Sequence, residues 1–212
     1  MKVFEHNRSL AYYFAPSILC FFCLIPWQSE DTDWSLAKSR NGISIYYRPS
    51  PKGGTLREMK IEMDISGSRN TFINYLRDED LVTKWMQGLD YQQVSIINDN
   101  HWVANQAYTF PWPIANKFIV IDYLQKDLGP MTIIELKSLT DREIPSGYEE
   151  MDPYNGHWKL QASHGDKLSI SYEIHPLKAS PYPRWIQDPI IQRNFLNSFE
   201  KLRDFVESAP KK

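Results

Sequence analysis

Hydrophobic and polar residues alternate in two stretches of the chain. In residues 56–65 every odd position from 59 onward is apolar and every even position from 58 onward is charged. Residues 168–175 repeat this pattern, with apolar even positions and polar or charged odd positions. A period of two with one polar face is typical of an antiparallel strand that has one face in the core and one in water.

Weaker alternation predicts more strands of the same kind. These are expected at residues 41–48, 91–97, 101–110, 117–126, 131–139 and 157–163. The segments between them contain turn residues, including two prolines and two glycines in residues 49–54, Gly129-Pro130 and Gly165-Asp166. Because short turns join neighbouring strands in an antiparallel sense, we expect most of the chain to form one meandering sheet.

Helices are predicted in two places: between the second and third strands, and at the C-terminal end of the chain. Ser68 is a suitable N-cap, after which Phe72, Tyr75 and Leu76 lie on one helical face; a second short helix is expected at residues 81–86. A long helix is expected to begin with Asp188 as its N-cap and Pro189 at its first position. Its apolar stripe consists of Ile191, Phe195, Phe199, Leu202 and Val206.

This order of elements predicts an α+β fold in which a curved antiparallel sheet wraps around the long C-terminal helix. A twisted sheet with this many strands curls, and its concave side is the place where the helix can bury its stripe. Because the curvatures of sheet and helix do not match, we expect a space between them that suits an apolar ligand.

The first 29 residues form a separate segment. Residues 9–29 contain no charged side chain, and Lys2 and Arg8 precede them. A short apolar run behind a basic start is typical of a secretory signal peptide, and an uncleaved N-terminal anchor is the alternative. We therefore expect an exported protein, in a periplasm or outside the cell. Cys20 and Cys23 both lie in this segment, so the remainder must be stabilised by its core rather than by disulfides.

Composition excludes several classes of protein. The 24 basic and 26 acidic side chains give a net charge of −2, which does not favour a nucleic-acid binder. His157, His164 and His175 are 7 and 11 residues apart, and this spacing predicts no metal site. No G-x-S-x-G motif is present, so no catalytic residue is assigned.

Five short motifs are spread over residues 34–206. They are Trp34 with the GISIY of residues 42–46, the DE…KW of residues 78–85, the PWPIAN of residues 111–116, the GHWKL of residues 156–160 and the PRWI of residues 183–186. In these motifs and their order, the chain resembles the START family, the lipid-transfer domains related to the steroidogenic acute regulatory protein. The family's Arg-Asp pair after the third motif is Lys117-Phe118 here, so no role is carried over to these positions.

The resemblance implies a helix-grip fold, also called START- or Bet v 1-like, over residues 30–212. It further implies that the protein binds, or binds and transfers, one lipid-like molecule such as a sterol without covalent chemistry, metal or cofactor. We expect a monomer with no nucleic-acid partner. The residues expected to contact the ligand are Trp85, Gln106, Tyr108, Glu135, Tyr172, Trp185, Ile186, Ile190 and Phe195.

Two other functions are compatible with the same fold. The first is a cyclase- or hydrolase-like enzyme, for which Asp122, Glu135 and Glu173 are candidate cavity carboxylates; alternation favours the solvent face for Asp122 and Glu173. The second is an interaction module whose core is filled by side chains. The aromatic loop at residues 110–113 is interpreted either as a transient membrane contact during ligand exchange or as packing at a sheet corner.

Overall fold

The computed structural model describes residues 34–163 and 167–209. The expected export segment, its two cysteines and His164 lie outside the described residues. The elements are β1 (Ser35–Arg40), β2 (Ile43–Pro49), β3 (Arg57–Ser66), α1 (Arg69–Arg77), α2 (Glu79–Trp85), β4 (Leu89–Asn98), β5 (His101–Tyr108), β6 (Lys117–Leu128), β7 (Met131–Leu139), β8 (Glu149–Glu150), β9 (Tyr154–Ala162), β10 (Lys167–Pro176) and α3 (Arg184–Ser208).

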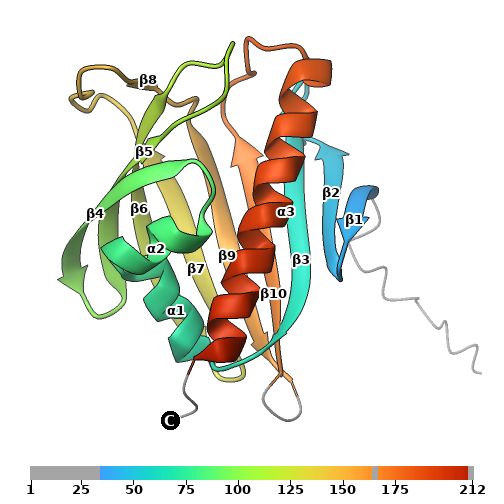
Figure 1. The fold of residues 1–212 in the computed structure, drawn as a ribbon, viewed down its shortest axis with the longest axis vertical. Coiled ribbons are helices and arrows are strands. Elements are labelled where there is room, and N and C mark those ends of the chain that lie inside the picture. The colour runs from blue at the N-terminus through green and yellow to red at the C-terminus, as the bar shows by residue number, and fades with distance from the viewer. Residues whose placement is uncertain (1–33, 164–166, 210–212) are drawn as a thin grey trace, which may run out of the picture. The chain divides into compact units, whose positions relative to one another are not determined.

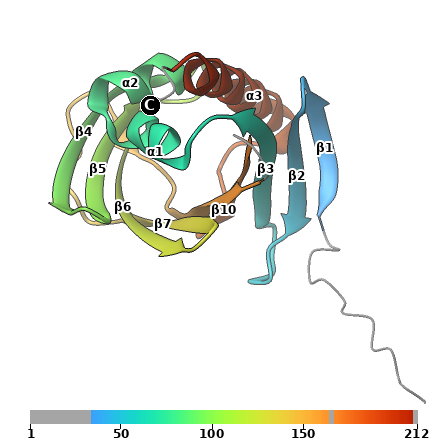
Figure 2. The same cartoon turned by 90° about the horizontal axis from the view of Figure 1, so that it is seen from below.

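The strands form one sheet of ten, in the order β1-β2-β3-β10-β9-β7-β6-β5-β4, with β8 added in parallel to β6. All other pairings are antiparallel. The pairing of β3 with β10 joins the first three strands to the last one (Figure 1). Seen from below, the sheet is a U whose open side is covered by α1, α2 and α3 (Figure 2). The predicted fold class, a curved antiparallel sheet around a C-terminal helix, is confirmed.

The inner face of the sheet carries the alternating apolar residues that the sequence predicted. Ile61 of β3 pairs with Tyr172 of β10, which pairs with Trp158 of β9, and all three are buried. The Trp158 ring stacks on Tyr172 at 4.0 Å between centroids and on Phe199 of α3 at 5.5 Å. Burying each such side chain stabilises the fold by about 1.5–3 kcal/mol, so this layer ties α3 to the middle of the sheet.

The start of α3 differs from the prediction. Asp188 is not its N-cap, because the helix begins at Arg184 and encloses Pro189. Proline has no N–H to donate to the preceding turn, so the first turn loses one internal hydrogen bond. Contacts from the sheet hold that turn instead: Arg57 Nη2 lies 2.7 Å from Asp188 Oδ1, and Arg184 Nη2 donates to the carbonyl of Thr55 at 2.6 Å. The Asp188-Pro189 sequence is typical of a helix N-terminus, but Asp188 forms an ion pair with Arg57 instead of capping the helix.

The two short helices follow local rules and are close to their predicted places. Ser68 caps α1 by accepting a hydrogen bond from the Thr71 N–H, as expected. Asp78 accepts from the N–H groups of Asp80 and Leu81, so α2 begins two residues before the expected position 81. Both helices bury one apolar face beside α3, so they close the open side of the sheet. Within the described residues, no helix is long and apolar enough to cross a membrane.

Two strands were missed. The first, β1, is an edge strand whose residues are mostly exposed, so it lacks the alternation that revealed the others. The second, β8, has two residues, too few to carry a periodic pattern. Neither contributes to the inner face of the sheet, so the position of the space beneath α3 does not depend on them.

Candidate functional site

A cavity of about 510 Å³ lies between the sheet and the N-terminal half of α3. Strands β3, β9 and β10 contribute Met59, Trp158, Tyr172 and Ile174 to its wall. The helix side consists of residues from the N-terminal half of α3: Arg184, Gln187, Asp188, Ile190, Ile191, Asn194, Phe195, Ser198 and Phe199. The loops at residues 110–117 and 176–183 complete one end, at the top of Figure 1.

The cavity exists because only the second half of α3 packs fully on the sheet. Leu196, Phe199, Leu202 and Val206 are buried there, whereas Ile191 and Phe195 are half-buried and border the space. The stripe predicted from the sequence is therefore divided between core packing at its C-terminal end and cavity wall at its N-terminal end.

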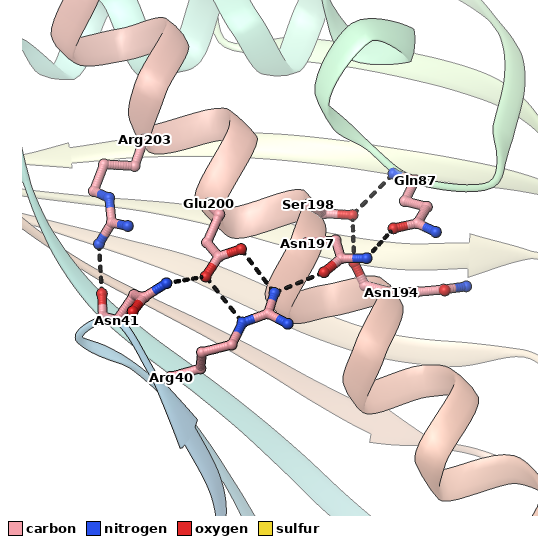
Figure 3. Close-up of polar contacts among 8 residues, drawn as sticks. All are labelled: Arg40, Asn41, Gln87, Asn194, Asn197, Ser198, Glu200 and Arg203. Atoms are coloured by element: carbon pink, nitrogen blue, oxygen red, sulfur yellow. Dashed lines mark hydrogen bonds and ion pairs between the residues drawn. The ribbon is translucent and has the colours of Figure 1, made fainter.

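Polar contacts fix the middle of α3 from both sides (Figure 3). On one side, Glu200 accepts hydrogen bonds from Arg40 Nη2 at 2.7 Å and Nε at 2.9 Å. On the other side, Ser198 Oγ accepts from the Gln87 N–H at 2.8 Å, and Asn197 Nδ2 donates to Gln87 Oε1 at 2.7 Å. These contacts join the β1–β2 turn and the segment after α2 to one helix, so α3 is held at a defined height above the sheet.

Buried amides and hydroxyls form a network behind the cavity wall. Tyr108 Oη donates to Gln106 Oε1 at 3.0 Å, and Gln106 Nε2 donates to Gln92 Oε1 at 2.5 Å and to Tyr123 Oη at 3.3 Å. Gln92 Nε2 in turn donates to the carbonyl of Leu76 at 3.2 Å. This network supports the Tyr108 ring, which borders the cavity.

Burial keeps the tyrosines of this region neutral. Desolvation raises the pKa of Tyr154 to about 12 and raises the pKa values of Tyr108, Tyr123 and Tyr172 well above the ordinary value of 10. The buried Nε1–H of Trp158 has no hydrogen-bond acceptor in the described part of the chain. The wall therefore offers uncharged polar groups in apolar surroundings.

Three basic groups at the cavity end form ion pairs. Besides the Arg57–Asp188 ion pair, Lys178 Nζ lies 3.7 Å from Asp152 Oδ1, and Lys117 Nζ lies 2.8 Å from Glu149 Oε2. Within each pair the opposite charges neutralise each other near the loops. The deeper part of the wall is aromatic and aliphatic.

Five of the residues expected to contact a ligand border the cavity: Trp85, Tyr108, Tyr172, Ile190 and Phe195. Gln106 lies behind Tyr108 in the polar network rather than in the wall. Ile186 is half-buried in the first turn of α3 and does not border the cavity. Trp185, in the same turn, is 77% exposed and also lies outside the lining.

The placement of Glu135 inside the cavity is wrong. Glu135 is exposed on the outer face of the sheet and pairs with Lys126 Nζ at 2.5 Å. Its neighbours Ile134 and Leu136 are buried, so alternation directs Glu135 outward. Asp122 is also outside the lining and lies 2.6 Å from His101 Nε2.

Several lining residues were not predicted. Asn194 and Ser198 are polar residues outside the predicted apolar stripe of α3, but both line the cavity because the helix is only partly packed there. Met86 ends the helix expected at residues 81–86, and Gln87 and Met151 lie in segments without regular structure; no signal in a single sequence places these residues at a wall.

No protein-family profile matches the sequence, and no curated protein matches it. Solved structures do match. The STAR-related lipid transfer protein of Xanthomonas axonopodis superposes with a TM-score of 0.74 at 21% identity over 83% of this chain and 99% of that one. Human StAR-related lipid transfer protein 5 gives 0.72 at 15% identity over 85% of this chain and 89% of that one.

A more distant match is the Zhui aromatase/cyclase of a Streptomyces species, with a TM-score of 0.51 at 10% identity over 72% of this chain and 94% of that one. At these identities the similarity concerns the fold alone. The described residues thus form a START-like, helix-grip domain, and the resemblance seen in the sequence motifs is confirmed at that level.

Proposed function

We propose that this protein binds one hydrophobic, lipid-like molecule without covalent chemistry in the cavity beneath α3, and that it carries this molecule between membranes. The observation that supports the proposal is the cavity of about 510 Å³ with a mainly aromatic and aliphatic wall. Its size is within the range of small-molecule sites, about 300–1,000 Å³. Two of the solved structures that share the fold carry the words lipid transfer protein in their names.

Partition provides the affinity in this proposal. Each 100 Å² of apolar ligand surface removed from water stabilises the complex by about 2.5 kcal/mol. The neutral hydroxyls of the tyrosines in the wall orient one polar group of the ligand, because a polar group buried without a hydrogen-bond partner is unfavourable. A hydroxyl-bearing lipid or sterol satisfies both requirements.

Two exposed tryptophans support contact with a membrane during ligand exchange. Trp112 is 91% exposed in the loop between β5 and β6, and Trp185 is 77% exposed in the first turn of α3. The exposure of Trp112 is the opposite of the sheet-corner packing considered from the sequence. Both residues belong to segments that border the cavity, and indole rings favour the membrane interface.

The two other functions receive less support. An interaction module with a filled core would not contain a cavity of this size. The enzyme interpretation requires a buried carboxylate or histidine in the wall. Among the described lining residues there is no histidine, cysteine or glutamate, and the aspartates, Asp152 and Asp188, are engaged in ion pairs at the loop end.

Export by residues 1–29, or anchoring by them, remains part of the proposal, as does a monomeric state. Cell fractionation and the intact mass of the purified chain test the first point, because cleavage shortens the protein by a defined segment. Light scattering of the purified protein tests the second. A full-length cytoplasmic chain would contradict the export proposal without affecting the proposal about the cavity.

A titration with a fluorescent fatty acid and a fluorescent sterol tests ligand binding. The delipidated full chain is expected to bind one of the two probes saturably at one per chain. Ile190→Trp places a larger side chain in the cavity and is expected to weaken binding at least tenfold. Ile97→Trp is the matched control, because Ile97 is 58% exposed on β4. No saturable binding of either probe, or undiminished binding by Ile190→Trp, would contradict the proposal.

A further inference from the structure

Three side chains of metal-ligand type meet on the outer face of the sheet. The antiparallel pairing of β9 and β10 puts His157 directly opposite Glu173, and His175 follows two residues later on the same face. One donor atom from each of the three side chains lies within 4.8 Å of the others. The cavity lies on the inner face and contains none of these residues.

The donor atoms converge on one point. Nε2 of His157 lies 3.8 Å from Glu173 Oε1, and Nε2 of His175 lies 3.8 Å from Glu173 Oε2. Ligands of a tetrahedral zinc ion at about 2.0–2.2 Å are about 3.3–3.5 Å apart, as tetrahedral geometry requires. Side-chain rotations that move each donor by less than about 1 Å therefore close the site around an ion.

A second carboxylate orients one of the imidazoles. Nδ1 of His175 lies 3.1 Å from Glu58 Oε2. Glu58 is itself 5% exposed and accepts hydrogen bonds from Arg48 Nε at 2.8 Å and Ser50 Oγ at 3.3 Å. A histidine that donates its Nδ1–H to a fixed carboxylate presents the lone pair of Nε2, which is the arrangement found behind zinc-ligating histidines.

The three side chains are partly exposed to solvent. The side chains of His157, Glu173 and His175 are 29%, 18% and 25% exposed. Across the neighbouring strands, Glu135 faces His157 and Lys60 faces Glu173, and Lys60 also pairs with Glu62 Oε1 at 2.9 Å. An ion bound here has solvent on its fourth side.

We propose that His157, Glu173 and His175 form a Zn²⁺ site on the outer face of the sheet, with Glu58 as the positioning residue of His175. Two imidazole nitrogens, one carboxylate and an open position are a ligand set that zinc accepts. The spacing of histidines along the chain predicted no metal site, because ligands that are distant in sequence leave no such pattern. These residues are 16 and 18 positions apart and are brought together by strand register.

Equilibrium dialysis of the full chain against Zn²⁺, with metal quantified by mass spectrometry, tests the site. Cys20 and Cys23 are competing zinc ligands, so the measurement uses the wild-type chain and the chain carrying Cys20→Ser and Cys23→Ser. The cysteine-free chain is expected to keep one Zn²⁺ per chain. His157→Ala and Glu173→Gln are expected to weaken binding more than 100-fold, and Glu58→Gln about 10–100-fold.

A control variant and two further measurements show whether a loss of zinc binding is specific to the proposed ligands. His101→Ala is the matched control, because His101 sits on the sheet with Asp122 alone as its acidic partner among the described residues, and it is expected to leave zinc affinity unchanged. Melting temperatures without metal show whether each variant folds, and Glu173→Gln retains size and shape. Histidine ring NMR is expected to show shifts at Nε2 of His157 and His175 when Zn²⁺ is added.

Loss of all zinc binding on replacing the cysteines, or equal binding by His157→Ala, Glu173→Gln and the parent chain, would overturn the proposal. In that case the three side chains are a surface cluster without a ligand. Because lipid binding is measured on the opposite face with a different probe, failure of this test leaves the cavity proposal standing, and the reverse also holds.

Discussion

At the scale of single residues, a close contact explains the glycine of one sequence motif. A Cβ atom at Gly156 would lie 2.2 Å from the carbonyl oxygen of Glu173, so the glycine of the GHWKL motif lets β9 approach β10. Trp158, two residues later, points to the inner face and lines the cavity. The glycine thus serves the strand pairing that positions the tryptophan.

Replacing Gly156 by alanine is expected to destabilise the protein by about 1–3 kcal/mol, the usual cost of overpacking. The obstacle is backbone in the middle of the sheet, which has little freedom to move. Gly67→Ala serves as comparison, because its Cβ meets the Cγ1 of Val206 at 2.5 Å near the end of α3, where the chain adjusts more easily. Urea unfolding measures both variants, and a smaller loss for Gly156→Ala than for Gly67→Ala would contradict this account.

The buried tyrosines predict a specific response to alkali. Because the pKa of Tyr154 is about 12 in the folded protein and near 10 when exposed, the folded state retains a proton that the unfolded state loses in between. Stability contributed by the neutral hydroxyl is complete below pH 10 and declines as pH rises toward 12. Phenolate absorbance followed with circular dichroism is expected to show these tyrosines ionising together with unfolding. Ionisation of all tyrosines near pH 10 in a folded chain would contradict burial.

At the scale of elements, α3 decides whether a cavity forms. The helix is anchored at its middle by Arg40, Gln87 and their partners, and at its N-terminus by Arg57 and the Thr55 carbonyl. Between these anchors, Ile190, Ile191, Asn194 and Phe195 line the cavity, whereas Leu196 is fully buried. These contacts hold the N-terminal half of α3 away from the sheet, and the cavity is the space between them.

Glu200→Gln is expected to cost about 0.5–1.5 kcal/mol, because it removes the charge from a carboxylate that accepts three hydrogen bonds from Arg40 and Asn41. Burial opposes ionisation of Glu200, but the hydrogen bonds from Asn41 and Arg40 outweigh it and hold the pKa of Glu200 below its ordinary 4.5. The stabilisation is therefore present above pH 4.5 and lost as pH falls through the lower folded value.

Hydrogen exchange measures the consequence for the helix. Amides in α3 are expected to exchange faster in Glu200→Gln than in the wild type, whereas Glu143→Gln, a change at an exposed loop position, leaves them unaltered. Equal exchange in both variants would show that the ion pair does not hold the helix.

The sequence predicted those elements whose signal is local. Alternation in β3 and β10, the cap at Ser68 and the stripe of α3 follow from side chains near one another in the chain. The start of α3 and the position of Glu135 were misjudged for different reasons. Arg57, which makes Asp188 an ion-pair partner, is 131 residues away, and no local signal shows that contact. For Glu135, the alternation of apolar and polar residues in β7 already predicted an outward-facing side chain.

At the scale of the whole molecule, the cavity and the exposed tryptophans lie at the same end. Trp112 lies in a loop, and Trp185 in a helical turn, whose neighbouring residues line the cavity, so an interface that received both rings would lie against this end of the cavity. Side chains from strands, helices and loops that are far apart in the sequence define this region, and their convergence depends on the curvature of the sheet. For that reason the sequence alone predicted the space but only part of its wall.

The double variant Trp112→Ala and Trp185→Ala is expected to transfer a fluorescent lipid between vesicles at least severalfold more slowly than the wild type, with unchanged equilibrium binding of the same probe. Both side chains are largely in water, so their removal affects the membrane-bound state more than the fold. Leu128→Ala, at an exposed position on β6, is the control. Unchanged transfer by the double variant would exclude a membrane role for these residues.

Native mass spectrometry of the purified full chain tests the central claim most directly, because it weighs protein and ligand together. Wild-type protein is expected to carry one apolar molecule per chain, recoverable by organic extraction, and Ile190→Trp is expected to lose it while Ile97→Trp retains it. A wild-type chain that has the mass of the bare polypeptide, and keeps that mass after incubation with fatty acids and sterols, would contradict the account.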